Sequence, residues 1–463
     1  MMQIIYEVNL LVCTTIVSAL PVYPLSFQKS GEVLSTLSLF IQGIISFQAE
    51  KVYLKNMRYK NESMDIVVSR QIGRKWGQCY LIVSIIYLLQ LTLLYSFQAL
   101  NMFSQIVFYF IDIIFKEKIQ QEYNMPISAL LISPLLFFII IKRKKKSICN
   151  IKSKAFLLSS LSILIYIIYI MVIFFSHYEI DRLDSQLQYI SILQIPNLLS
   201  SNNLAYVNQL YLHWILTFQN QRVAKQSKLS VKYSTLIIFI IYILVGNLGS
   251  YSIQNRQPLD QNNNNFIFDY FSDNALTVVV KIFMISHFFQ NLSYKYLLLR
   301  ESLLRLILIS KQIQDSKQIK KRMKLIFNII FPLFLTFINI EQSNLQYKFT
   351  VMTGSLAGFF IIYLIPYKLQ FGKFKQTQRI LFKNLSIQDS TPFSSIQEAQ
   401  EEDSKLIESQ SKLLPQLIQL KKLKKDFFKT SLKKANFFDK AILLFGFFIS
   451  MYGILYFIYS VIN

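Results

Sequence analysis

The most constraining feature of this sequence is a pair of long uncharged runs separated by a dense basic segment, all within residues 123–176. The runs cover residues 123–141 and 155–176, and the segment between them carries most of its Lys and Arg in one cluster at 142–146. An α-helix rises about 1.5 Å per residue, so about twenty apolar residues span the ~30 Å hydrocarbon core of a bilayer. The pattern predicts two membrane helices joined by a cationic turn.

The same unit recurs along the whole chain. Hydrophobic residues make up 53% of the 463 residues and charged residues only 16%, whereas about a quarter is charged in typical soluble domains. We therefore expect an all-α, polytopic integral membrane protein with about 11 transmembrane helices. The predicted spans are the N-terminal run before Pro21 and residues 33–49, 77–97, 123–141, 155–176, 204–220, 233–248, 275–299, 325–340, 349–367 and 441–462.

One apolar stretch is too long for a single span and too short for two. It begins at Gly77, and the first charge after it is Asp112. A second crossing at 98–115 would move the next basic turn to the opposite side of the membrane. We therefore predict one span at 77–97 and an interfacial or re-entrant helix at 98–115, with Phe103, Val107, Phe110 and Ile114 on its apolar face.

The distribution of basic residues predicts the orientation. Five turns between spans hold 42 of the 49 Lys and Arg residues, six lie in turns on the opposite side, and Lys281 lies within a span. Short cytoplasmic loops are enriched in Lys and Arg, so this division predicts an N-terminus on the cytosol-like side and a C-terminus on the opposite side.

Three parts are expected along the chain. Residues 1–367 form the transmembrane bundle with about ten spans, 368–440 form a loop on the cytosol-like side, and 441–463 form the final span. Residues 386–405 are serine-rich and acidic, which is typical of disorder. Residues 412–434 alternate apolar residues and lysines, as in an amphipathic helix on anionic lipid head groups or in a solvated linker. The candidate lipid contacts are Lys421, Lys422, Lys424 and Lys425.

Polar residues gather in three spans. They are costly in hydrocarbon and normally face protein or water. Tyr206, Gln209, His213, Thr217 and Asn220 recur at helical spacing, and Asn328 and Pro332 share a span with a proline-induced kink. Two readings stay open, a polar pathway through the bundle and simple hydrogen bonding between helices. The candidate pathway residues are Tyr206, Gln209, His213, Thr217, Lys281, His287, Gln290, Asn291, Asn328 and Pro332. Lys281 lies near the outer end of its span, where we expect it to extend to the outer surface.

Small residues at close helical spacing predict helix packing in the last two spans. These residues are Gly354, Gly358, Gly446, Ser450 and Gly453.

The sequence favours a transport-type or channel-type function for ions, small solutes or lipids. The competing function is a non-catalytic subunit or scaffold of a larger membrane complex, with other membrane proteins as partners, and a lipid-acting enzyme is a more distant alternative.

The chain contains no HExxH, GxSxG, P-loop or GxGxxG motif, so no catalytic site is predicted. The three cysteines and two intramembrane histidines lack ligand spacing, so no metal or cofactor is expected. The basic charge of +24 lies in short turns, not on a soluble surface, so nucleic acid is not expected as a partner. The membrane concerned is not specified by the sequence.

Overall fold

The structure is a computed structural model of the 463-residue chain. It describes residues 2–16, 20–57, 63–115, 154–177, 195–207, 209–210, 212, 224–253, 267–271, 274–311, 352–370, 440–451 and 454–455.

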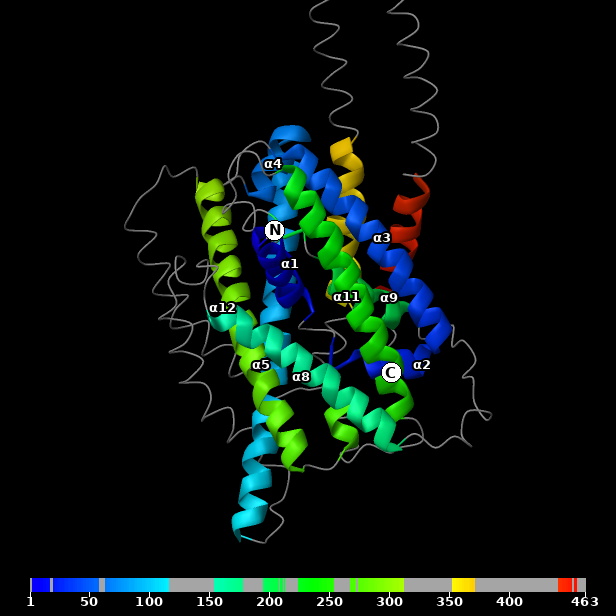
Figure 1. The fold of residues 1–463 in the computed structure, drawn as a ribbon. Coiled ribbons are helices and arrows are strands. Elements are labelled where there is room, and N and C mark those ends of the chain that lie inside the picture. The colour runs from blue at the N-terminus through cyan, green and yellow to red at the C-terminus, as the bar shows by residue number, and fades with distance from the viewer. Residues whose placement is uncertain are drawn as a thin grey trace, which may run out of the picture.

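Every element among the described residues is helical, and together they form one elongated bundle (Figure 1). Six of these helices are long and apolar enough to cross a membrane, which makes the chain a multi-pass integral membrane protein. They are α3 (Glu32–Asn56), α5 (Arg74–Phe115), α8 (Lys154–His177), α11 (Ala224–Ile253), α12 (Ala275–Lys311) and the helix Met352–Gln370. The shorter elements are α1 (Met2–Thr15), α2 (Tyr23–Ser30), α4 (Met64–Gln71), α9 (Ile195–Tyr206), η5 (Ile267–Tyr270) and the helix Lys440–Met451.

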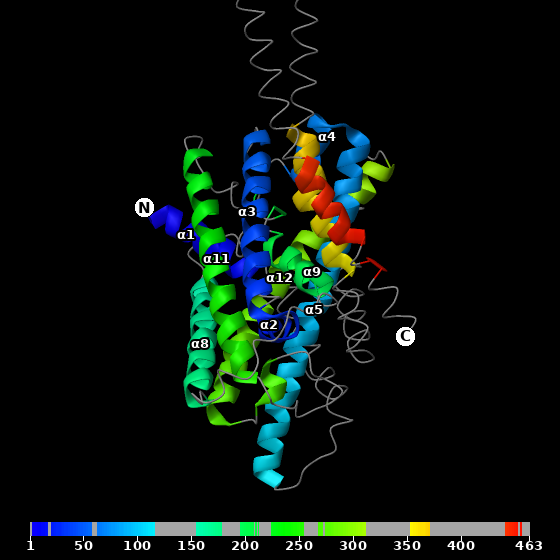
Figure 2. The ribbon, with the colours of Figure 1, turned by 90° about the vertical axis from the view of Figure 1, so that its right-hand side faces the viewer.

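The periphery of the bundle is apolar on its outer face. On α8, the residues Leu157, Leu161, Leu164, Ile168 and Phe175 are all exposed, and their spacing places them on one side of the helix. The opposite side of α8 packs against α11 and α12, and Figures 1 and 2 show α8 at the margin of the bundle. A continuous exposed apolar stripe of this kind is suited to contact with lipid chains.

The N-terminal helical segment is interrupted near the centre of the bundle. Helix α1 ends at Thr15, and α2 begins at Tyr23 with Pro24 in its first turn. Proline is accommodated at the start of a helix but removes a backbone hydrogen bond from a helix interior. Both halves pack on the same helix, α11 (Figure 2). The interruption therefore leaves helix ends inside the protein.

A second helix also ends in the core. Helix α9 stops at Tyr206, Val207 lies outside it, and Gln209 lies in a turn. The prediction of a helix that starts at residue 204 is therefore wrong. Helix α9 begins at Ile195 and ends at Tyr206, close to where the predicted span begins. The predicted stripe from Tyr206 through Gln209 does not run along one continuous helix.

The predicted break after residue 97 is also wrong. Helix α5 is continuous over 42 residues, and the chain from 78 to 115 contains neither glycine nor proline to interrupt it. Ala99, Leu100, Met102 and Ile106 are buried in the bundle, so this part is not an interfacial helix. Figure 1 shows the C-terminal part of α5 continuing beyond the neighbouring helices.

Candidate functional site

The two interrupted regions meet through side chains. The Tyr23 hydroxyl at the start of α2 donates to Asn202 Oδ1 on α9 at 2.9 Å. Asn202 Nδ2 donates in turn to Ser38 Oγ on α3 at 3.0 Å. This chain of hydrogen bonds joins three helices around the place where α1 stops and α2 starts.

The neighbouring Asn203 extends the network to a fourth helix. Gln42 Nε2 on α3 donates to Asn203 Oδ1 at 2.6 Å, and Tyr363 Oη donates to Gln42 Oε1 at 2.5 Å. Tyr363 belongs to η6 (Phe359–Leu364), a π-helical turn within Met352–Gln370. Such turns frequently occur at functional sites. Gly358 immediately precedes η6, and a Cβ there would lie 2.6 Å from Asn203 Cγ, so only glycine allows this approach.

The C-terminal end of α9 is capped by the Ser46 side chain of α3. Ser46 Oγ donates to the Tyr206 carbonyl at 2.8 Å, and Gln209 Nε2 donates to Ser46 Oγ at 2.9 Å. The last carbonyls of a helix have no partner within the helix and must find one elsewhere when buried. Ser46 therefore stabilises a helix end inside the core.

Aromatic rings close the other side of this region. The rings of Tyr23 and Tyr242 lie 4.4 Å apart, and those of Tyr206 and Tyr242 lie 6.4 Å apart. Tyr242 Oη donates to the Thr15 carbonyl at the end of α1 at 3.4 Å. We call Tyr23, Gln42, Asn202, Asn203, Tyr206 and Gln209 the central site.

Three atoms of the central site are buried without a hydrogen-bond partner among the described residues. They are Asn203 Nδ2, Tyr206 Oη and Gln209 Oε1, and these side chains are at most 1% exposed. An unsatisfied buried polar group costs about 1–3 kcal/mol, so native proteins seldom retain several in one place without a reason. A donor, a hydroxyl and an acceptor are thus available to a polar ligand.

A second polar region joins α1, α8 and α12. Ser160 Oγ on α8 donates to Asn9 Oδ1 on α1 at 2.7 Å, and Cys13 contacts both residues at 3.4 Å. The adjacent Ser159 Oγ is hydrogen-bonded to His287 Nδ1 on α12. Further along α12, Lys295 Nζ donates to the Thr14 carbonyl at 2.8 Å.

The predicted pathway residues are divided between these regions. Tyr206 and Gln209 lie in the central site, whereas His287 lies in the α1–α8–α12 seam and Asn291 donates to the His287 carbonyl of its own helix at 3.0 Å. Gln290 is partly buried. The residues His213, Thr217, Asn328 and Pro332 lie outside the described residues, as do Lys421, Lys422, Lys424 and Lys425.

Lys281 does not extend to the outer surface as expected. Its side chain is only 1% exposed, and Nζ lies 5.8 Å from the centre of the Phe268 ring in η5. The short helix η5, which lies between α11 and α12 in the sequence, is thus adjacent to this lysine.

The small residues predicted to pack have different neighbours. A Cβ at Gly446 would lie 2.5 Å from Tyr363 Cγ, and Ser450 Oγ donates to the Ser355 carbonyl at 2.9 Å. The helix Lys440–Met451 therefore contacts Met352–Gln370 at both positions. Gly358 instead faces Asn203 of α9. Gly354 is buried in the same helix, and Gly453 lies outside the described residues.

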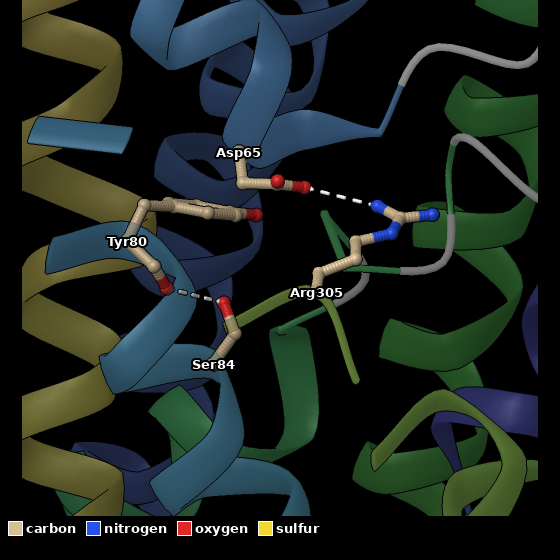
Figure 3. Close-up of polar contacts among 4 residues, drawn as sticks. All are labelled: Asp65, Tyr80, Ser84 and Arg305. Carbon is tan, nitrogen blue, oxygen red and sulfur yellow. Dashed lines mark hydrogen bonds and ion pairs between the residues drawn. The ribbon is translucent and has the colours of Figure 1, made fainter. Parts of the chain in front are cut away.

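An ion pair lies at one end of the bundle. Arg305 on α12 lies 3.1 Å from Asp65 on α4 (Figure 3). Beneath it lies a cavity of about 30 Å³, lined by Asp65, Tyr80, Ser84, Leu88, Leu210, Leu298, Glu301 and Arg305 among others. This volume has room for one or two water molecules.

Several important polar residues were not identified from the sequence. Asn202 and Asn203 were assigned to a connection because they follow two serines and precede the predicted span, yet both are buried in α9. Glu7 and Glu50 are also buried, and Glu7 accepts a hydrogen bond from Ser230 at 2.6 Å. Acidic residues are therefore buried on α1 and α3 within the bundle. No cluster of three His, Cys, Asp or Glu residues that could hold a metal occurs in the part of the chain that the structure describes.

Comparison with known proteins shows similarity in fold only. No protein-family model and no curated protein sequence matches the chain. The chain is similar in fold to the solved structure of MHP1, a nucleobase-cation-symport-1 family transporter in a closed conformation with bromovinylhydantoin bound. The similarity covers 77% of this chain and 76% of MHP1, with a TM-score of 0.50 and 9% sequence identity. The manganese transporter of Eremococcus coleocola, in complex with an aromatic bis-isothiourea substituted compound, aligns over 98% of this chain and 95% of its own with 10% identity, at a TM-score of 0.43.

Proposed function

We propose that this protein is a membrane transporter that carries a small, uncharged, polar solute through the central site. The observation that carries the proposal is that the break between α1 and α2 lies beside the buried C-terminal end of α9, joined by the bond from Tyr23 to Asn202. Transporters commonly bind their substrates where discontinuous helices expose backbone and polar side chains near the membrane midplane. The fold similarity to a nucleobase-cation-symport-1 transporter supports the same function.

The chemistry of the central site favours a neutral solute with both donors and acceptors. Its unpartnered atoms are an amide nitrogen, a phenol oxygen and an amide oxygen. The six side chains that define it are uncharged, and the one carboxyl that acts on them among the described residues is that of the buried Glu50, which interacts electrostatically with Tyr206. The adjacent Tyr23, Tyr206 and Tyr242 rings suit a flat ligand. Nucleobases and related cyclic amides therefore form the first group of solutes to test.

We further propose eleven spans with the N-terminus on the cytosol-like side. Ser250 on α11 donates to Glu32 on α3 at 3.0 Å, so these helices are antiparallel and the start of α11 lies at the same end as the close of α3. The Asp65–Arg305 pair brings the C-terminal part of α12 to that end as well. Three of the five basic turns thus adjoin one end of the bundle, as expected for a cytosol-like face. Residues 412–434 would lie on anionic head groups at this face.

Uptake by purified protein in lipid vesicles tests the proposed function. In Tyr206→Phe, the substitution removes an oxygen that has no partner among the described residues. We expect thermal stability to be unchanged or slightly raised, while uptake of the transported solute falls about tenfold, as for the loss of one hydrogen bond of about 1.4 kcal/mol.

The matched control is Tyr53→Phe. Tyr53 is equally buried, but its hydroxyl donates to the Ile361 carbonyl at 2.8 Å. This variant should lose stability and retain uptake per folded molecule. If no cyclic amide or nucleobase is taken up by the wild type, or if both variants lose uptake equally, the central site is not the substrate site. The subunit or scaffold function would then be favoured.

A further inference from the structure

The side chain of Lys295 makes an unusual contact inside the bundle. Lys295 lies on α12 and is 1% exposed, and its Nζ donates to the Thr14 carbonyl at 2.8 Å. The same ammonium group lies 6.0 Å from the centre of the Tyr95 ring on α5. Lysine is rarely buried to this extent, so a specific electrostatic partner is required.

The end of α1 provides such a partner. Thr14 is the residue before the last in α1, and the final carbonyls of a helix carry a partial negative charge because they have no partner in the helix. Thr15, the next residue, has its carbonyl contacted by Tyr242 Oη from α11. The ring face of Tyr95 adds a further site that attracts cations. The position is therefore electronegative.

In many secondary transporters, carbonyls at the end of an interrupted helix hold the coupling cation. Here the ammonium group of Lys295 lies at such a helix end, the carbonyl end of α1. The seam around it is polar but compact, with Ser159 bonded to His287 and Ser160 bonded to Asn9. Lys295 reaches the end of α1 from the facing helix, as a tethered ion.

We propose that the ammonium group of Lys295 is a built-in cation at the carbonyl end of α1, and that it replaces a bound metal cation in the working cycle. The role in a cycle rests on the proposed transport function, whereas the occupancy of the position by Lys295 does not. A transporter of this kind requires no Na⁺ gradient. It would move its solute at the same rate in sodium and in choline salts.

Thermal unfolding of the full chain in lipid nanodiscs tests this directly. The midpoint is measured in sodium chloride, methylammonium chloride and choline chloride at equal ionic strength. We expect the wild-type midpoint to be the same in all three salts. Lys295→Ala should unfold at a lower temperature in choline and should regain at least half of the lost temperature in sodium or methylammonium, since these small cations fit the vacated position.

Lys281→Ala is the matched control, because Lys281 is equally buried on the same helix but lies beside η5. Its midpoint should fall by the same amount in all salts. A wild-type midpoint that rises with sodium, or a Lys295→Ala loss that is identical in every salt, would overturn the proposal. If Lys295→Ala does not fold, two other measurements decide the question. One is the comparison of the wild-type midpoint between salts. The other is the midpoint of Lys295→Arg, which keeps the charge and should not depend on sodium. No substrate is needed, so a failure of solute uptake would remove the transport function without altering this result.

Discussion

At the scale of single residues, the central site depends on two kinds of side chain. Asn202 and Ser46 have their polar atoms in hydrogen bonds that hold helices together, whereas Asn203, Tyr206 and Gln209 each keep one atom unpartnered among the described residues. The first group fixes the geometry, and the second remains available to a ligand. Pre-organised groups of this kind bind without the cost of ordering them first.

Glycine has an equally specific role where the last described helix contacts the site. A Cβ at Gly446 would lie 2.5 Å from Tyr363 Cγ and 2.6 Å from Cδ1. These atoms form the base of a ring that is fixed by its bond to Gln42. We expect Gly446→Ala to lower the free energy of unfolding by about 1–3 kcal/mol through overpacking, and to reduce uptake by displacing Tyr363.

The measurements are chemical denaturation in mild detergent and uptake per folded molecule. Ser450→Ala serves as the control on the same helix, because it removes only the bond to the Ser355 carbonyl, at about 0.6 kcal/mol. An equal loss of stability in the two variants would show that Tyr363 can move away from a methyl group at 446.

Sequence spacing led to predictions of helix contacts, whereas it missed the residues that are placed by tertiary structure. The small residues Gly446 and Ser450 were selected from their spacing, and both contact a neighbouring helix. Asn202 and Asn203 were missed because serine and asparagine favour turns when considered locally. Lys295 lies within the predicted span at 275–299 but was not among the candidate residues, and the structure places it inside the bundle on α12.

At the scale of elements, helix ends were harder to predict than helices. Hydropathy identified the apolar core of α3, α8, α11 and α12, since these segments are apolar for the length of a bilayer. It did not show that the first span is divided into α1 and α2, because Pro21 and Pro24 indicate only that a helix cannot continue. Charge counting likewise predicted a single crossing at 77–97, but the end that it implied for this helix is wrong, because α5 continues to Phe115.

The contact between α4 and α12 leads to a prediction about access to the core. Asp65 and Arg305, which form an ion pair (Figure 3), line the same small cavity as Ser84. Ser84 is buried. A partly exposed ion pair contributes about 1 kcal/mol, which corresponds to about a fivefold change in an opening equilibrium. We therefore expect Asp65→Asn to raise the rate at which a thiol reagent reaches Ser84→Cys by about fivefold.

This rate is measured in a background with Cys13, Cys79 and Cys149 replaced by serine. The exchanged pair, Asp65→Arg with Arg305→Asp, should return the rate toward the value with the native pair, because the attraction is restored with its direction reversed. Equal labelling in all three proteins would show that the ion pair does not restrict access from this end.

At the scale of the whole molecule, the apolar exterior and polar interior fit a membrane protein whose function lies in its core. The exposed face of α8 is apolar throughout the bilayer length, while Gln42, Asn203 and Gln209 are buried at the centre. The sequence predicted the membrane class correctly because composition and run length are properties of the whole chain. It did not predict the central site, since this site forms only when helices distant in sequence come together.

The orientation proposed for the chain gives the broadest prediction. If basic turns have been kept on one face, the segments 142–154 and 412–434 lie on the same side as α4, and the connection 254–266 lies on the other. Sealed vesicles of known orientation are treated with a thiol reagent that does not cross membranes. Three single-cysteine proteins suffice, carrying the native Cys149 alone, Ser431→Cys or Asn262→Cys, with the remaining native cysteines replaced by serine. We expect Cys149 and the cysteine at 431 to react from the cytosol-like face and the cysteine at 262 from the opposite face. Reaction of the first two from opposite faces would mean that an odd number of crossings separates them, and the eleven-span topology would have to be abandoned even if the central site transports a solute.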